Sequence, residues 1–270
     1  MLRRETEQGW VLISQHDHAR LSYKLMSAWN FESFYRPSEL DEVLFALQEH
    51  DSGWKELDAS PKINQNNRFP ADFTEMEPFE QSDIWRRCIE SFEGSHPYAS
   101  ALIALHFSLF NERNLKKAPE NLQSLKMRAE MNDLVRRILG VEFDGLELAK
   151  LPDPLRSDMR MLQIGDMLSL AICLGRSDYS VDDVPCNNRG SNPGNDPRKS
   201  SLILMSSSDR IHYTFRPYPF VPPEIELSVE GRLLDKRTFD DHAELRDCIE
   251  SSPRISLELT VSQDTSNANT

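Results

Sequence analysis

Residues 155–174, LRSDMRMLQIGDMLSLAICL, set the tightest limit on how this chain can fold. After Met159 a helix formed by this stretch is apolar on nearly every side, so we expect other elements to surround it at the centre of the molecule. Asp166 lies in the middle of the apolar face that Leu162 also occupies. A lone carboxylate in such a place is usually neutralised or excluded, and a cation offers the simplest relief. Gly165 beside it would let another backbone or a ligand approach closely.

A second helical stretch, residues 38–54 (SELDEVLFALQEHDSGW), ends in a vicinal His–Asp pair. Its apolar stripe includes Leu47, and the same helical spacing continues onto His50 and Asp51. Burying an ionised carboxylate beside an imidazole is costly without a strong partner, and a metal cation is one of the few groups that satisfy both. Gly53 is the residue type that ends a helix. The alternative is a plain His–Asp hydrogen bond at a frayed helix end.

Two further helices carry a histidine on their apolar side. In the segment 16–29, His18 lies on the apolar stripe. In the segment 96–110, His106 sits in the middle of the apolar face. His96 would lie roughly 15 Å from His106 along the helix axis, so both cannot bind one ion. We choose His106, because His96 precedes a proline at a helix end.

A single shared site explains the polar residues on the apolar faces of these four helices better than four independent coincidences do. The predicted metal ligands are His18, His50, Asp51, Asp166 and His106. Imidazole nitrogen and carboxylate oxygen together suit Mn²⁺, Fe²⁺, Zn²⁺, Co²⁺ or Ni²⁺, as one or two ions. The four cysteines are scattered without a CxxC spacing, so we expect a catalytic metal site without thiolate ligands.

Charge and hydropathy restrict the possible partners. The chain has 270 residues, of which 31 are basic and 44 acidic, and its formal charge of −13 repels polyanions, so we expect no nucleic acid. A run of about 18 apolar residues is missing, so we expect no membrane span. A small phosphorylated molecule remains possible if a metal reverses the local charge. The scattered cysteines are typical of reduced thiols in a cytoplasmic protein, and nothing in the sequence indicates an oligomeric state.

The order of the motifs DHARLS, HDSGW, LH at 105–106 and GDMLSL resembles the HD superfamily of metal-dependent phosphohydrolases. That superfamily has a His on an early helix, a vicinal His–Asp pair and an Asp on a late helix. The matching positions are His18, His50, Asp51 and Asp166, and His106 matches an additional histidine of several members. With the later PYPF, the chain is most similar to a group of functionally uncharacterised bacterial proteins with the same motif order. The Lys that follows HDxG in the cyclic-dinucleotide phosphodiesterase branch is replaced by Trp54, which leaves the substrate class open.

The resemblance and the residue patterns together predict an α+β fold, a mainly α-helical HD-like bundle with a small C-terminal antiparallel β-sheet subdomain. The helical metal-binding domain would span residues 1–182, with a short strand at 9–14 that could pair with the C-terminal sheet. The Pro/Gly/Asn-rich residues 183–200 would form a flexible linker. Residues 201–261 would form the small sheet, and residues 262–270 a disordered tail.

The leading functional hypothesis is a metal-dependent phosphohydrolase acting on a small phosphoester. His18, His50, Asp51 and Asp166 would hold the first metal, and His106 would bind a second ion or act as an acid or base. A non-haem iron oxygenase using the same ligands is the second hypothesis. The third is a non-catalytic module that binds a nucleotide or a partner. Candidate substrate-side groups are Arg86 and Arg87, although such arginines more often form surface ion pairs.

Overall fold

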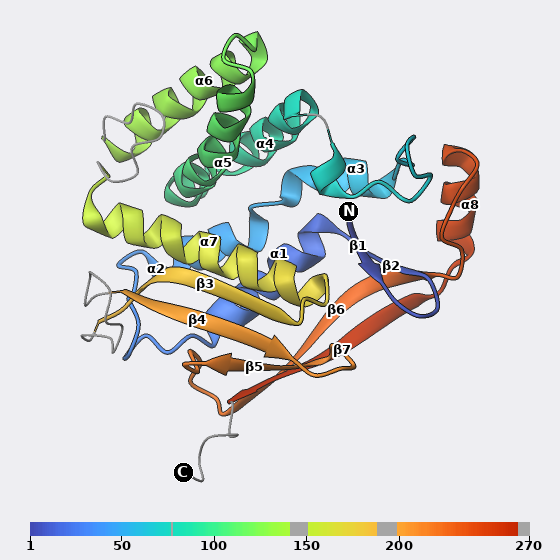
Figure 1. Ribbon diagram of the computed structural model, residues 1–270. Helices are drawn as coiled ribbons and strands as arrows, with labels where there is room; N and C mark the ends of the chain where they lie inside the picture. Colours follow the sequence, from blue (N-terminus) through green and yellow to red (C-terminus); the bar gives the residue numbers. More distant parts are fainter. Residues whose placement is uncertain (77, 141–150, 188–198, 264–270) are drawn as a thin grey trace.

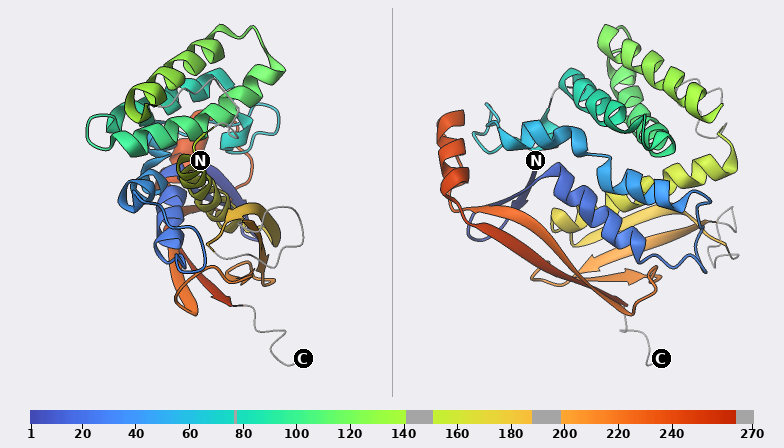
Figure 2. Two further views of the ribbon diagram at one scale, coloured as in Figure 1. Left: turned by 90° about the vertical axis from the view of Figure 1, so that its left-hand side faces the viewer. Right: turned by 180° about the vertical axis from the view of Figure 1, so that it is seen from behind.

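The computed structural model describes residues 1–76, 78–140, 151–187 and 199–263. The elements lie in three layers, a curled sheet, a middle layer with α1, α2 and α7, and an outer group of α4, α5 and α6 (Figures 1 and 2). In chain order the elements are β1 (Leu2–Glu5), β2 (Trp10–Ile13), α1 (Gln15–Ser27), α2 (Leu40–Glu49), the 3₁₀ turn η1 (Ser52–Trp54), α3 (Lys55–Ala59), the 3₁₀ turn η2 (Phe73–Glu75), α4 (Pro78–Phe92), α5 (Pro97–Lys117), α6 (Leu122–Leu139), α7 (Asp153–Cys173), β3 (Asp178–Pro185), β4 (Lys199–Ser206), β5 (His212–Arg216), β6 (Glu224–Leu234), α8 (His242–Ser251) and β7 (Arg254–Gln263).

The strands form one seven-stranded sheet in the order β1-β2-β6-β7-β5-β4-β3. Neighbouring strands are antiparallel except β5 and β7, which pair in parallel. The prediction of a mainly α-helical HD-like bundle with a small C-terminal antiparallel sheet is therefore wrong. The sheet is mixed, and it recruits β1 and β2 from the start of the chain and β3 from the end of the region expected to be helical.

Two strands escaped prediction because their sequences do not alternate between apolar and polar residues. In β1 the charged Arg4 is only 5% exposed, and its guanidinium donates to the carbonyl oxygens of Ile172 and Arg210 at 3.1 and 2.7 Å. Strand β3 lies at the edge of the sheet, and its Asp182 and Asp183 are exposed. Because of the buried charge in β1 and the exposed edge position of β3, neither sequence alternates between apolar and polar residues, the pattern that marks a half-buried strand.

The predicted linker and tail are only partly described. Residues 183–185 belong to β3 and residues 199–200 to β4, so the ends of the predicted linker 183–200 lie in the sheet. Residues 188–198 lie outside the described residues. Residues 262 and 263 complete β7, and the rest of the predicted tail, 264–270, is also outside the described part.

Helix α7 lies at the centre of the fold, as its apolar sequence predicts. It packs against α1, α2, α5 and β3. The main hydrophobic core extends from this helix to the inner face of the sheet, where Leu227 and Val229 of β6 are buried. A smaller core, with Trp10 and Leu234 in the sheet and Leu245 in α8, closes the far end. Among the described helices, none combines the length and apolarity needed to cross a membrane.

Candidate metal centre

The structure brings together all five side chains that the sequence suggested as metal ligands. His18 lies on α1, His50 and Asp51 directly follow α2, His106 lies on α5 and Asp166 on α7. Each is buried, with exposed fractions from 0% for His18 to 6% for the two aspartates. Four helices thus direct polar side chains to one point inside the molecule.

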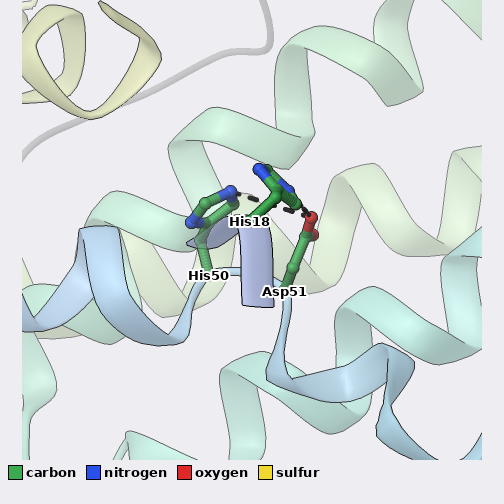
Figure 3. A group of neighbouring side chains, drawn as sticks. All are labelled: His18, His50 and Asp51. Atoms are coloured by element: carbon green, nitrogen blue, oxygen red, sulfur yellow. Dashed lines mark hydrogen bonds and ion pairs between the residues drawn. The ribbon is translucent and has the colours of Figure 1, made fainter. Parts of the chain in front are cut away.

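Four of these residues form a tight group, here called the four-residue cluster: His18, His50, Asp51 and Asp166. The Nε2 atom of His18 lies 2.7 Å from Oδ2 of Asp51 and 4.0 Å from Oδ1 of Asp166. The Nε2 atom of His50 lies 3.7 Å from the same Asp51 oxygen and 3.4 Å from the same Asp166 oxygen. Figure 3 shows both imidazoles beside the Asp51 carboxylate. Two nitrogen and two oxygen atoms therefore converge.

His106 stands beside the cluster, on the other side of the Asp166 carboxylate. Its Nε2 lies 3.6 Å from Oδ2 of Asp166, whereas His18 and His50 face Oδ1. Eight residues earlier on each helix, Tyr98 of α5 donates a hydrogen bond to Asp158 of α7 at 2.5 Å. Helices α5 and α7 therefore meet at two points eight residues apart, which brings His106 to Asp166.

Two glycines allow the helices to approach closely at the site. A Cβ atom on Gly165 would lie 2.4 Å from Leu47 of α2 and 2.7 Å from Ser22 of α1, so side chains of neighbouring helices approach here in place of the backbone or ligand that the sequence suggested. A Cβ atom on Gly53 would lie 2.2 Å from the carbonyl oxygen of Ile84 in α4. The sequence suggested Gly53 as a helix end, but α2 already ends at Glu49. Its lack of a side chain instead lets α4 pack against the turn after Asp51.

The Nδ1 atoms of the three histidines, which point away from the carboxylates, differ in their surroundings. The Nδ1 atom of His50 lies 2.9 Å from the carbonyl oxygen of Leu47, and Nδ1 of His18 lies 3.0 Å from the hydroxyl of Ser169. The Nδ1 atom of His106 is buried without a hydrogen-bond partner in the described part of the chain. Metal-binding histidines commonly donate their outer N–H to such an acceptor, which directs the other nitrogen to the ion. His18 and His50 have this support, and His106 lacks it.

Burial and the neighbouring charges shift the pKa values of His50, Asp166 and the adjacent His106 in different directions. Burial lowers the pKa of His50, but the carboxylates of Asp51 and Asp166 outweigh this and raise it to about 9. Burial acts to raise the pKa of Asp166, but the adjacent imidazoles, foremost His50, bring it down to about 2. Burial lowers the pKa of His106 to about 4, so this imidazole is neutral at pH 7. The two carboxylates therefore attract a positive charge, which a proton on His50 supplies in part.

The residues present fit a divalent cation. The Nε2 atom of His50 is buried and forms no hydrogen bond within the described residues, although it faces two carboxylates. Tetrahedral ligands about 2.1 Å from an ion lie about 3.4 Å from one another. The separations of 3.4, 3.7 and 4.0 Å are close to that value, and the 2.7 Å hydrogen bond between His18 and Asp51 would have to lengthen. The ligand atoms of His18, His50 and Asp51 lie within 4.8 Å of one another.

The sequence family that matches this chain is described as "Protein of unknown function (DUF3891)", and the match covers residues 1–236. The chain belongs to this family. The matched part contains all five site residues and ends just after β6, so α8 and β7 lie beyond it. Neither the curated proteins nor the solved structures gave a match.

Within the DUF3891 match, the other candidate residues lie elsewhere. Arg86 forms ion pairs with Asp83 and Glu130 at 2.7 and 2.9 Å, as the surface alternative predicts. Arg87 contacts the carbonyl oxygen of Gly53 at 3.4 Å. His96 stacks on Phe45 and pairs with Glu42 at 2.9 Å, outside the cluster.

Sequence reasoning overlooked two residues that support the DUF3891 site. Ser169 contacts His18 and lies three residues after Asp166, so the helical period alone could have placed it on the same face. The thiol of Cys88 donates to the carbonyl oxygen of His50 at 3.0 Å and so supports the turn that carries Asp51. Nothing in the sequence around Cys88 indicates this contact, because it joins α4 to a distant turn.

Proposed function

We propose that this protein is a metal-dependent phosphohydrolase that acts on a small phosphoester. One observation carries the proposal: the side chains of His18, His50, Asp51 and Asp166 converge from three separate helices, with paired ligand atoms 2.7–4.0 Å apart. Burying imidazoles and carboxylates is costly unless hydrogen bonds or a cation satisfy them, and a divalent ion satisfies all four side chains together.

We also propose a relationship to the HD superfamily, on the order of the ligands alone. An early His, a vicinal His–Asp pair and a late Asp occur in that order along the chain, on α1, after α2 and on α7. The proposal does not extend to a helical bundle, because the described fold contains a large mixed sheet.

Each residue has a distinct part in this proposal. His18 and His50 would hold the ion through Nε2, and Asp51 and Asp166 through one carboxylate oxygen each. When bound, a divalent cation acts as a Lewis acid that offsets charge on phosphoryl oxygens and makes water nucleophilic near neutral pH. His106 is neutral at pH 7, so its Nε2, which faces the cluster, can accept a proton there. A carboxylate oxygen of Asp166 faces this nitrogen and can hold the protonated imidazole in place.

The charges and the exposure of the cluster favour an anionic substrate approaching from one side. Two carboxylates and a divalent ion sum to zero, so a phosphoester would not meet the negative field of the rest of the chain. The side chains of Asp51 and Asp166 are 8% and 9% exposed, whereas those of His18 and His50 are 0% and 1% exposed. The substrate would therefore approach at the carboxylates.

Activity measurements with a matched control test the proposal. The protein is stripped of metal, reloaded in turn with Mn²⁺, Fe²⁺, Zn²⁺, Co²⁺ and Ni²⁺, and assayed against a panel of phosphomonoesters and phosphodiesters. We expect hydrolysis with at least one ion, and a loss of at least about 100-fold in His50→Ala, since even residues that only support a ligand cost 10–100-fold. His212→Ala, which changes an exposed histidine outside the site, should match the wild type. A metal-loaded protein that hydrolyses no ester, or that consumes O₂ with Fe²⁺ instead, would contradict the proposal.

A further inference from the structure

Ser169 is a buried residue that contacts both His18 and the backbone of Asp166, two members of the four-residue cluster. Its side chain is 0% exposed on α7, one turn after Asp166. The hydroxyl oxygen lies 3.0 Å from Nδ1 of His18 and 2.9 Å from the backbone carbonyl oxygen of Asp166. It therefore joins α1 to the segment of α7 that carries the late aspartate.

The two contacts of the Ser169 hydroxyl determine which atom carries each proton. A carbonyl oxygen has no hydrogen, so an attractive contact at 2.9 Å requires that the hydroxyl donate its single proton to the Asp166 carbonyl. The hydroxyl can then only accept from His18, which means that Nδ1 of His18 carries a hydrogen. The nitrogen left for an ion is consequently Nε2, which faces Asp51 and Asp166; an ion bound there would replace the hydrogen that Nε2 donates to Asp51 at 2.7 Å.

We propose that Ser169 is a positioning residue that keeps Nδ1 of His18 protonated and so reserves Nε2 for the metal. This inference rests on the proposed function, because it needs an ion in the cluster. The carbonyl oxygen of Leu47 does the same for His50 from the backbone, where substitution cannot remove it. Ser169 is thus the side chain through which the tautomer of a cluster histidine can be altered without removing a ligand.

The first measurement is Zn²⁺ affinity, determined by competition with a chromophoric chelator. Loss of such a supporting group typically weakens metal binding 10–100-fold, and we expect this loss in Ser169→Ala. Ser108→Ala is the matched control, since Ser108 is also buried in a helix and donates to a carbonyl oxygen of its own helix, that of Ala104, at 2.7 Å. The control should bind Zn²⁺ as the wild type does, and thermal unfolding monitors the fold of both variants.

The second measurement follows the His18 N–H itself, by NMR of the Zn²⁺-loaded protein labelled with ¹⁵N-histidine. In the wild type we expect a protected, hydrogen-bonded Nδ1–H resonance that moves upfield and exchanges faster in Ser169→Ala but not in Ser108→Ala. A role in packing alone would not move this resonance. Equal Zn²⁺ affinity of the two serine variants, or an unchanged resonance in Ser169→Ala, would overturn the inference and leave the proposed function standing. A wild type that binds no Zn²⁺ or other divalent ion would overturn the proposed function and this inference with it.

Discussion

At the scale of single residues, helical spacing was sufficient to predict which side chains lie together, because each candidate ligand is the polar exception on an otherwise apolar face. His18, His106 and Asp166 are buried where core side chains would normally lie, and their helices could be predicted locally. What the spacing could not provide is the geometry. Whether His106 would join a first ion or stand beyond Asp166 depends on how α5 packs on α7, which is a tertiary property.

Replacing His106 separates a role in proton transfer from a role in holding the first ion. In His106→Gln we expect kcat to fall by about 10²–10⁴-fold, the usual contribution of a general acid or base, while metal content stays at the wild-type level. The reason is that His106 faces Oδ2 of Asp166, whereas His18 and His50 face Oδ1. In addition, Nδ1 of His106 lacks, among the described residues, the hydrogen-bond partner that His18 and His50 have. Steady-state kinetics and elemental analysis of the same preparation check this. Loss of the tightly bound metal in this variant would show that His106 is a ligand of the first ion.

The pKa of His50 predicts how the stability of the metal-free protein depends on pH. The folded value of about 9 lies above the ordinary value of 6.5, so the folded state holds this proton more tightly than the unfolded chain. The resulting stabilisation, on the order of 3 kcal/mol, is complete below pH 6.5 and is lost as the pH rises through 9. Urea unfolding of metal-free wild type and His50→Gln should therefore show a stability difference that shrinks between pH 6.5 and 9. A difference that stays constant with pH would contradict this assignment.

At the scale of elements, the helices were predictable and two of the strands were not. Helix α1 begins where Ser14 accepts from the backbone N–H of Asp17, and α6 ends at Gly140, whose φ of 64° is left-handed. Such signals are local and can be found in a sequence. The burial of Arg4 in β1 depends instead on carbonyl oxygens far along the chain, so no local pattern marks it.

The close packing of α1, α2 and α7 at Gly165 gives a prediction about stability. A Cβ atom there would lie within 3.0 Å of atoms from Leu47, Ser22 and Met26. Overpacking of this kind usually costs more than the roughly 1 kcal/mol that alanine gains in a helix, so we expect Gly165→Ala to lose about 1–3 kcal/mol. Gly94→Ala is the control, since a Cβ atom there meets no described atom within 4 Å, and its stability should change by less than about 0.5 kcal/mol. Equal unfolding midpoints of the two variants would show that the helices can move apart freely.

At the scale of the whole molecule, the sheet joins parts of the chain that the sequence appeared to separate. Strand β2, near the start of the chain, pairs with β6, more than 200 residues later, through Trp10 and Leu234. The expected pairing of the strand at 9–14 with the C-terminal sheet is thus confirmed. The pairing of β1 and β3 in the same sheet left no local trace, which is why the compositional boundary at 183–200 suggested two domains. The helices that carry His18 and Asp166 rest on this sheet, since α1 packs on β6 and α7 on β3. The candidate metal centre and the sheet are therefore parts of one structure.

The united sheet predicts that the helical region does not fold by itself. A fragment of residues 1–187 contains every site residue but lacks β4, β5, β6 and β7, so the inner faces of β2 and β3 and the sides of α1 and α7 would be exposed. We expect this fragment to lack a cooperative thermal transition and to bind no metal, whereas the full chain should unfold in one transition by circular dichroism. A fragment that unfolds cooperatively and binds metal as the full chain does would restore the two-domain description.

The metal content of the purified, reloaded protein tests most directly whether the five side chains form a metal centre. Wild type and Asp166→Asn are loaded with Zn²⁺ or Mn²⁺, passed through gel filtration and measured by elemental analysis, with circular dichroism to verify the fold. The amide is the same size as the carboxylate but lacks the charge that the cation would balance. We expect one or two ions per chain in the wild type and close to none in Asp166→Asn. A wild type without bound metal, or equal metal content in the two folded proteins, would contradict a metal centre at this position.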